Sequence, residues 1–575
     1  MLDDVGSFRS AILVYFGKDK EKKSIFSIIR KNAESFVGLV CGIWKKTRKF
    51  ARRISIRTSN RMIKMRIREA VMAAALMMLS SAQAQENSLA LEKEGKLVEY
   101  NPMIFGQFIE HFDNQVYGGI FDPGNPLSDE DGFRTDVIEA IKELKTPIVR
   151  WPGGCFVSTY HWLDGVGNNR QPVYDKTWQA EDPNTFGTDE YVKWCRKIGC
   201  EPYICTNAGT GTPEEMSDWV EYCNLNVGKW GKLRAQNGHP EPYNVKYWSV
   251  GNENWGRHEL GARTVAEWGP LVRESAKLMR SVTKDIKLFA AATSDPNWSL
   301  PLLKEAGWTL DYISIHGYWD PLFHVNNPAP FIDCMMKTDA PERDIVRTID
   351  ILDQAGFGGG KIKIAYDEWN LRNWHHPWHG DLRRGFDFEA RRKNDIASTY
   401  TLADALFSAC FLNACLRHSD IVDIACFSPI VNTRGALRVD KDGITRRTTY
   451  FVLFMYANYL EKYYAPAKTS FAPLVHNDKQ TSVLDAIVTC DKEAKRFVCA
   501  VVNKDPNQDA GMAIDFASMG MRQPKEVSAW VLAGRSADDY NDRGDEHVRP
   551  EQRKLKVKNS TVSIPAHSLT FITVE

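Results

Sequence analysis

Two glutamates in this sequence each follow a short apolar run and lie among asparagine and tryptophan side chains. Glu253 lies in the segment Gly251-Asn252-Glu253-Asn254, and Glu368 lies in Asp367-Glu368-Trp369-Asn370. A protonated carboxyl group can deliver its proton to a leaving oxygen, and an ionised one can attack a carbon atom. Cleavage of a glycosidic bond uses such a pair. One glutamate alone would be explained by a salt-bridge network, but two in the same setting favour catalysis.

Other polar side chains occur at the same kind of position, directly after an apolar run. They lie in the segments Gly106-Gln107-Phe108-Ile109-Glu110-His111, Arg150-Trp151-Pro152-Gly153-Gly154-Cys155 and His316-Gly317-Tyr318-Trp319. In a barrel of parallel strands, the C-terminal strand ends and the loops after them line the active site. We therefore expect these groups to meet the two glutamates at one end of a barrel.

The elements that must position these groups alternate between short apolar runs and longer helical patterns, from about residue 102 to 432. The predicted strands are 104–109, 147–151, 202–206, 245–250, 286–292, 312–315, 362–366 and 421–427, and the helical patterns include 135–145, 189–198, 213–224 and 265–281. Eight alternations with strands apolar on both faces predict an α/β fold. A closed (β/α)8 TIM barrel is favoured over an open doubly wound sheet.

After about residue 460 the pattern changes to short strands without comparable helices, which is typical of a β-sandwich. The strands expected there are 482–489, 496–502, 526–532, 554–558 and 568–574. The predicted organisation is an N-terminal extension with a secretory signal peptide at 1–84 and a strand segment that joins the sandwich at 85–101. The catalytic barrel follows at 102–455, and a jelly-roll-like C-terminal β-sandwich at 456–575.

The sequence before residue 85 has the pattern of a secretory signal peptide. Basic residues precede an apolar run at 70–79, and Ala82-Gln83-Ala84 has the form of a cleavage site. The run is shorter than the ~20 residues that span a bilayer. We therefore expect no stable membrane span, and a secreted or periplasmic protein cleaved near Ala84. Translation is expected to begin at Met62 or Met65, and the alternative for residues 1–61 is a basic arm that binds a partner.

Composition describes a soluble globular protein, with 43% hydrophobic and 26% charged residues. The formal net charge is +1, but residues 1–70 hold 18 of the 74 Lys and Arg and only 6 of the 73 Asp and Glu. The rest of the chain is therefore mildly acidic, and we expect no nucleic-acid partner.

The cysteines and histidines do not form a recognisable metal site. Of the 12 cysteines, Cys41 precedes the signal, and the 11 that remain are scattered and cannot all pair, so buried free thiols are expected. The triplet Cys195, Cys200 and Cys205 lacks a second cluster, and the histidine-rich loop at 375–379 lacks a placed carboxylate. We expect no metal and no cofactor.

The motifs resemble those of a known glycosidase family. The two glutamate segments are similar to the acid/base and nucleophile motifs of retaining barrel glycosidases. Phe105-Gly106-Gln107-Phe108-Ile109-Glu110-His111 and Arg150-Trp151-Pro152-Gly153-Gly154 narrow the resemblance to glycoside hydrolase family 51, the α-L-arabinofuranosidases. Residues 178–190 and 564–569 are similar to that family as well, and the resemblance extends from about residue 90 to 575.

The resemblance implies a role for each residue of the expected site. Glu253 would protonate the leaving oxygen and later activate water, and Glu368 would form a covalent arabinosyl intermediate. Asn252 and Glu110 would bind sugar hydroxyls. The residues expected to bind substrate or to hold the nucleophile are Glu110, Arg150, Cys155, Trp178, Asn252, His316, Tyr318 and Asn432. Two positions differ from many members, which have asparagine at Cys155 and glutamine at Ser428.

The expected function is therefore that of a retaining, exo-acting α-L-arabinofuranosidase. It would remove terminal non-reducing α-L-arabinofuranosyl residues from arabinose-containing plant polysaccharides and oligosaccharides by double displacement. The alternatives are a β-xylosidase or an endo-glucanase on the same scaffold, or a non-catalytic carbohydrate-binding barrel, against which the intact Glu253 and Glu368 argue. The resemblance also implies a homo-oligomer, and the sequence leaves the preferred polymer and linkage open.

Overall fold

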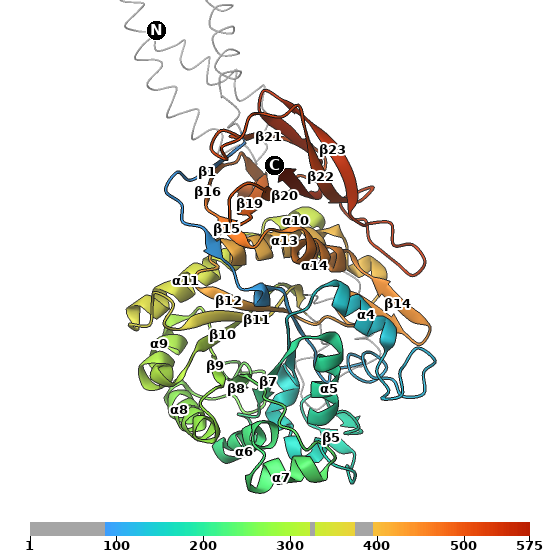
Figure 1. Ribbon diagram of the computed structural model, residues 1–575, viewed down its shortest axis with the longest axis vertical. Helices are drawn as coiled ribbons and strands as arrows, with labels where there is room; N and C mark the ends of the chain where they lie inside the picture. Colours follow the sequence, from blue (N-terminus) through green and yellow to red (C-terminus); the bar gives the residue numbers. More distant parts are fainter. Residues whose placement is uncertain (1–86, 322–327, 374–394) are drawn as a thin grey trace, which may run out of the picture. The chain divides into compact units, whose positions relative to one another are not determined.

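The computed structural model describes residues 87–321, 328–373 and 395–575 (Figure 1). The predicted signal peptide, its cleavage site at Ala84 and the histidine-rich loop at 375–379 lie outside these residues. Within the described ranges, no helix combines the length and the apolar character that a membrane crossing requires.

Eight parallel strands form a closed barrel, which confirms the predicted TIM-barrel fold. They are β3 (Gly106–Phe108), β4 (Ile148–Trp151), β7 (Glu201–Thr206), β8 (Tyr247–Val250), β9 (Lys287–Ala291), β10 (Tyr312–Pro321), β11 (Lys363–Asn373) and β12 (Val422–Phe427). Each overlaps one strand predicted from the sequence. However, β10 and β11 continue well beyond the expected ends at residues 315 and 366, so that His316, Tyr318 and Glu368 lie inside the strands and not after them.

A helix follows each strand of the barrel. These helices are α4 (Thr135–Glu143), α5 (Thr188–Ile198), α6 (Pro213–Asn224), α8 (Val265–Val282), α9 (Pro296–Ala306), α11 (Ala340–Gln354), α13 (Leu402–Arg417) and α14 (Thr448–Tyr459). Their ends follow ordinary capping chemistry. The Thr212 side chain accepts a hydrogen bond from the Glu215 N–H at the start of α6, and Gly199, whose φ of +90° suits glycine, caps the end of α5.

Nine C-terminal strands and two strands that precede the barrel form a sheet of eleven strands in the order β16-β1-β21-β24-β23-β22-β25-β20-β19-β15-β2. Their bounds are β1 (Ser88–Leu91), β2 (Val98–Glu99), β15 (Tyr463–Ala465), β16 (Ala467–Ser470), β19 (Leu484–Cys490), β20 (Phe497–Asn503), β21 (Ala510–Ile514), β22 (Glu526–Ala533), β23 (Glu551–Lys558), β24 (Thr561–Ile564) and β25 (Ser568–Val574). The two halves of the sheet enclose their own core, which includes Met512, Val562, Val501 and Ile572. On the barrel side, α13 packs against β19, β20 and β25 (Figure 1).

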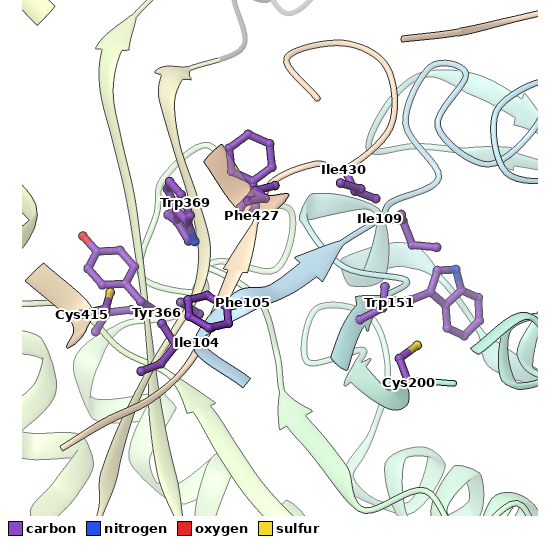
Figure 2. Close-up of a cluster of buried hydrophobic side chains, with 14 of the residues drawn as sticks. Ile104, Phe105, Ile109, Trp151, Cys200, Tyr366, Trp369, Cys415, Phe427 and Ile430 are labelled. Carbon is purple, nitrogen blue, oxygen red and sulfur yellow. The ribbon is translucent and has the colours of Figure 1, made fainter. Parts of the chain in front are cut away.

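Aromatic rings outside the barrel fix the strands that carry the site (Figure 2). Trp369 of β11 stacks on Phe411 of α13 with ring centroids 3.7 Å apart, and it meets Phe427 edge-on at 5.1 Å. Trp151 of β4 stacks in the same way on Tyr191 of α5, at 4.6 Å. Successive side chains of a strand point to opposite faces, so the residues before these tryptophans face the barrel interior.

All eleven cysteines among the described residues are free thiols, and ten of them are buried, as expected from their scattered positions. Burial removes these side chains from water, where each behaves as a small apolar group. The fold is therefore held by packing and hydrogen bonds within the part of the chain that the structure describes.

Candidate active site

The two predicted catalytic glutamates meet at the C-terminal end of the barrel. Glu253 lies in the loop after β8 and Glu368 lies within β11, and their exposed fractions are only 8% and 6%. An oxygen of each glutamate and a ring nitrogen of His316 lie within 4.8 Å of one another. The two carboxyl groups are therefore close enough to act on the same sugar ring.

Glu368 receives one hydrogen bond on each carboxylate oxygen. Arg150 of β4 donates from Nη1 to Oε2 at 2.9 Å, and the Tyr318 hydroxyl of β10 donates to Oε1 at 2.5 Å. Because His316 pairs in register with Glu368 across β10 and β11, its Nδ1 lies 3.5 Å from Oε2. Charge-assisted hydrogen bonds of this kind fix both the position and the direction of the carboxylate.

Arg150 connects the two halves of the site. It is fully buried, its Nε lies 3.3 Å from Asp367, and its Nη2 donates to Asn252 Oδ1 at 2.7 Å. Asp367 also accepts hydrogen bonds from two hydroxyl groups of the barrel interior, at 2.6 Å each. Burial alone would raise the pKa of Asp367, but Arg150 and His316 hold that pKa below its usual value. The buried guanidinium thus has carboxylate partners, as a buried charge requires.

Glu253 contacts two imidazoles. His258 Nε2 lies 2.7 Å from Oε2, and His316 Nδ1 lies 2.8 Å from Oε1. Burial alone would raise the pKa of Glu253, but the two histidines outweigh it and hold the pKa well below its usual range. The contact with Glu253 raises the pKa of His258 to about 9. Burial lowers the pKa of His316, but Glu368, Asp367 and Glu253 together raise it to about 10.

The exchangeable proton of this cluster therefore lies on an imidazole, one hydrogen bond away from the carboxylate of Glu253. Three strongly interacting groups of this kind titrate as a unit, so the protonation of Glu253 depends on the charge of the two imidazoles. The cluster can store the proton that a general acid must deliver.

The loop after β8 presents Glu253 in an uncommon backbone conformation. Its φ is +45°, in the left-handed region that residues other than glycine rarely adopt. Hydrogen bonds close the loop, from the Gly256 N–H to the Glu253 carbonyl at 2.6 Å and from the Arg263 N–H to the Asn254 carbonyl at 2.7 Å. Such a conformation costs about 1–3 kcal/mol and is typical of functional sites.

Cys155 lies on the same side of the site as Glu253 and next to the buried Glu259. Glu259 accepts hydrogen bonds from Ser158 Oγ at 2.6 Å, from Asn252 Nδ2 at 3.3 Å and from the Cys155 thiol. Burial, together with the charge of Glu253, raises the pKa of Glu259 to about 7. Burial and the carboxylates around it raise the pKa of Cys155 well above its usual value, so its thiol carries a proton and is a poor nucleophile.

Glu110 lies in the loop after β3 and also holds a proton. Its Oε1 accepts hydrogen bonds from Trp178 Nε1 and the Phe156 N–H, both at 3.0 Å. Burial and the charge of Glu368 raise the pKa of Glu110 to about 8. The carboxyl group can therefore both donate to and accept from a sugar hydroxyl near neutral pH. Trp178 is fixed edge-on against Phe112, with ring centroids 4.3 Å apart.

The loop after β12 supports Tyr318. Ser428 Oγ lies 2.8 Å from the Tyr318 hydroxyl, Arg434 Nη2 donates to that hydroxyl at 2.9 Å, and the Arg434 guanidinium lies 4.7 Å from the ring centroid. Asn432 lies in the same loop, where its amide donates to one backbone carbonyl at 2.6 Å and accepts from one backbone N–H at 2.7 Å. The structure thus shows Asn432 bracing the loop, and its contact with a sugar stays a prediction.

Three residues of the site were not among those predicted, namely His258, Glu259 and Arg434. Two sequence features could have pointed to them. His258 and Glu259 belong to the polar run Arg257-His258-Glu259 in the loop after Glu253, and Arg434 lies only two residues after Asn432. Sequence spacing in an irregular loop does not give side-chain direction, because that direction depends on how the loop closes. Only the folded loop shows that these side chains point to the glutamates.

Comparison with known proteins gives the family. Residues 140–335 match the family model described as Alpha-L-arabinofuranosidase 1 domain, and residues 367–568 match that of the Alpha-L-arabinofuranosidase C-terminal domain. A probable α-L-arabinofuranosidase C from Aspergillus niger is 35% identical over 516 residues, which cover 84% of this chain and 96% of that protein.

Two bacterial proteins are similar as well. An intracellular exo-α-(1→5)-L-arabinofuranosidase of Acetivibrio thermocellus is 31% identical over 485 residues, which cover 82% of this chain and 92% of that protein. The solved structure of the thermostable GH51 α-L-arabinofuranosidase from Thermotoga petrophila has a TM-score of 0.72 and 31% identity, over 85% of this chain and 100% of that one. With the barrel and its paired glutamates, these similarities show that this chain belongs to glycoside hydrolase family 51, the α-L-arabinofuranosidases.

Proposed function

We propose that this α-L-arabinofuranosidase acts by a retaining double displacement, with Glu368 as the nucleophile and Glu253 as the general acid and base. The distance between the carboxyl groups supports this mechanism. Retaining glycosidases hold them about 5–5.5 Å apart, whereas inverting enzymes need about 6.5–9.5 Å to admit a water molecule. An oxygen of Glu253 lies within 4.8 Å of an oxygen of Glu368, which fits the shorter, retaining spacing.

In the first step, an oxygen of Glu368 attacks the anomeric carbon of the arabinofuranosyl group. The bond from that carbon to the leaving oxygen breaks, and the leaving oxygen takes a proton from Glu253. In the second step, Glu253 takes a proton from water, and the water oxygen displaces Glu368 from the anomeric carbon. Two inversions at one carbon retain its configuration. Arg150 and Tyr318 keep the Glu368 carboxylate aimed through both steps.

The proton for the first step comes from an imidazole that contacts Glu253. His258 belongs to the loop after β8, and its side chain is 54% exposed, so a glycosidic oxygen can take its place against the Glu253 carboxylate. The proton then passes to Glu253 along the 2.8 Å contact that remains, with His316 as the source. Loss of the His258 contact removes one of the two interactions that lower the pKa of Glu253, so Glu253 can hold the proton and act as the acid.

The substrate we propose is a terminal non-reducing α-L-arabinofuranosyl residue of an arabinose-containing polysaccharide or oligosaccharide. Two observations support it, namely the family of the chain and the protonated Glu110 beside Trp178, which offers a donor, an acceptor and an aromatic face to one small sugar. Turnover of aryl α-L-arabinofuranoside, aryl β-xyloside and soluble β-glucan tests it. Activity on the xyloside or the glucan alone would favour a β-xylosidase or an endo-glucanase. Sugar binding without turnover would favour a non-catalytic barrel.

The retaining mechanism has its own test, because the anomeric configuration of the first sugar released reports the stereochemistry of the reaction. Proton NMR of the reaction in its first minutes should show α-L-arabinofuranose before mutarotation mixes the anomers. The β anomer as the first product would require an inverting mechanism. It would also mean that the carboxyl groups move apart when substrate binds.

We further propose that the protein is exported, with cleavage after Ala84. The support is the basic segment, the apolar run at 70–79 and the Ala82-Gln83-Ala84 motif. N-terminal sequencing of protein from the native host should find Gln85 as the first residue. Protein that retains residues 1–60 outside the cytoplasm would contradict the proposal.

A further inference from the structure

A thiol, an imidazole and two carboxylates meet on one side of the active site. They belong to Cys155, His258, Glu253 and Glu259, and one potential ligand atom of each lies within 4.8 Å of the others. Three of the four come from the loop after β8, and Cys155 begins the short helix η3 (Cys155–Thr159) after β4. Within the described ranges, one other group has metal-ligand spacing, and it consists of Glu253, His316 and Glu368 without a thiol.

We propose that Cys155, Glu253, His258 and Glu259 form a binding site for Zn²⁺ or a similar thiophilic divalent cation, and that a cation bound there blocks hydrolysis. Zinc sites in proteins use these donor atoms, at metal–ligand distances of about 2.0–2.3 Å in a tetrahedron. Such a tetrahedron places its ligand atoms about 3.3–3.8 Å apart. Side chains whose ligand atoms already lie within 4.8 Å need only a small contraction.

The ligand types select the cation. Thiolate and imidazole are preferred by zinc and related soft ions, whereas Mg²⁺ and Ca²⁺ take oxygen ligands. The carboxylate of Glu259 is already held in position by two hydrogen bonds, from Ser158 Oγ at 2.6 Å and from Asn252 Nδ2 at 3.3 Å. Hydrogen bonds to ligating side chains of this kind are a regular feature of metal sites.

The site also has an entry path. The side chain of His258 is 54% exposed, whereas Glu253 and Glu259 are buried, so a cation from solvent meets the imidazole first. His258 already contacts Oε2 of Glu253 at 2.7 Å. A cation held between these two groups would take the carboxylate oxygen that must carry a proton. The inhibition therefore rests on the role proposed above for Glu253, whereas the binding does not.

The test uses untagged, full-length protein that has been freed of metal with a chelator. Zn²⁺ binding is measured by calorimetry, and Co²⁺ binding by absorption, because a cobalt–thiolate charge-transfer band reports a cysteine ligand directly. We expect that band in the near ultraviolet. We also expect Zn²⁺ to abolish the turnover of an aryl α-L-arabinofuranoside and excess chelator to restore it.

Variants assign the site. Cys155→Ser should remove the cobalt–thiolate band, and both Cys155→Ser and His258→Gln should weaken zinc binding and require more zinc for inhibition. His161 is a partly exposed histidine that contacts Glu215, outside the cluster, so His161→Gln should bind zinc as the unmodified protein does. The site would be overturned if the unmodified protein showed no cobalt–thiolate band. It would also be overturned if zinc inhibited both cluster variants as strongly as the unmodified protein.

Two further outcomes separate this proposal from the proposed function. Zinc binding at the cluster without loss of turnover would refute the inhibition. Metal-free protein without turnover on any arabinofuranoside would refute the proposed function and leave the cation site standing if the thiolate band were present.

Discussion

Replacing Glu253 by alanine should affect two kinds of substrate differently. The two donors that hold Glu368, Arg150 and Tyr318, make no contact with Glu253 that the structure shows, so the nucleophile stays in place. His316 keeps its contact with Asp367 at 3.4 Å and does not depend on Glu253 alone. An activated aryl leaving group, which needs little protonation, is therefore still displaced. The covalent intermediate then accumulates, because no general base activates water.

The size of each loss follows from the step that it affects. General acid–base assistance contributes about 10²–10⁴-fold to a step that needs it. A natural arabinosyl linkage needs it for formation of the intermediate, so kcat/KM should fall by about 10²–10⁴-fold. For the activated aryl substrate, kcat/KM reports a step that needs little protonation and should fall by less than about tenfold. Its kcat should fall by about 10²–10⁴-fold, because hydrolysis of the intermediate becomes limiting.

The assay is a rapid-mixing measurement of aryl release, which should show a burst followed by slow turnover. Azide needs no general base, so adding it should restore turnover and give an arabinosyl azide of α configuration by net retention. Protein that lacks the Glu368 nucleophile provides the control, since it should give neither burst nor azide product. If Glu253→Ala lost equally on both substrates and azide restored nothing, the assignment of the acid/base would be wrong.

Further predictions concern the rest of the site. Glu368→Ala should lower turnover of every substrate by several orders of magnitude, and residual activity on aryl substrates alone would contradict its role as nucleophile. Tyr318→Phe removes a charge-assisted hydrogen bond worth about 1.5–3 kcal/mol, so kcat/KM should fall about 10–150-fold, and a loss below about twofold would count against it. The folded protein holds a proton on Glu110 up to about pH 8, where an unfolded chain releases it near 4.5, so the stabilising contribution is full below about 4.5 and is lost as pH rises to about 8. The Tm of Glu110→Gln should therefore fall less than that of the unmodified protein as pH rises over this interval. Equal slopes of Tm against pH for the two proteins would refute the assignment. Chelator treatment should leave turnover unchanged, because two carboxylates perform both catalytic roles, and an activity that returned only with added divalent ion would contradict this.

The barrel could be predicted because its strands are buried on both faces, which leaves an apolar run in the sequence for each of them. The same feature explains the error at β10 and β11. The apolar runs end at residues 315 and 366, but the strands continue because His316, Tyr318 and Glu368 face a polar interior. A polar residue in a strand is easily mistaken for the start of a loop when its partners across the barrel are unknown.

The residues of the candidate site that lie in sequence motifs were predicted. Those whose direction depends on the path of an irregular loop were missed. Glu253 and Glu368 follow from their motifs directly after apolar runs, whereas the contact of His258 with Glu253 depends on a turn with a left-handed residue. The short strands β21 and β24 of the C-terminal sheet were missed as well, because Ala510–Ile514 and Thr561–Ile564 are only five and four residues long and give too short a pattern. Their pairing is set by neighbours distant in the sequence.

The position of β1 in the C-terminal sheet has a consequence for the synthesis of the chain. Ser88–Leu91 pairs with β16 on one side and with β21 on the other, so one of the first described segments lies between two strands from the C-terminal part of the chain. A ribosome releases this strand several hundred residues before its partners exist. The sheet therefore closes only after the whole barrel has been made. A tag or a processing site placed between residues 88 and 91 would divide the finished sheet and create two new unpaired edges.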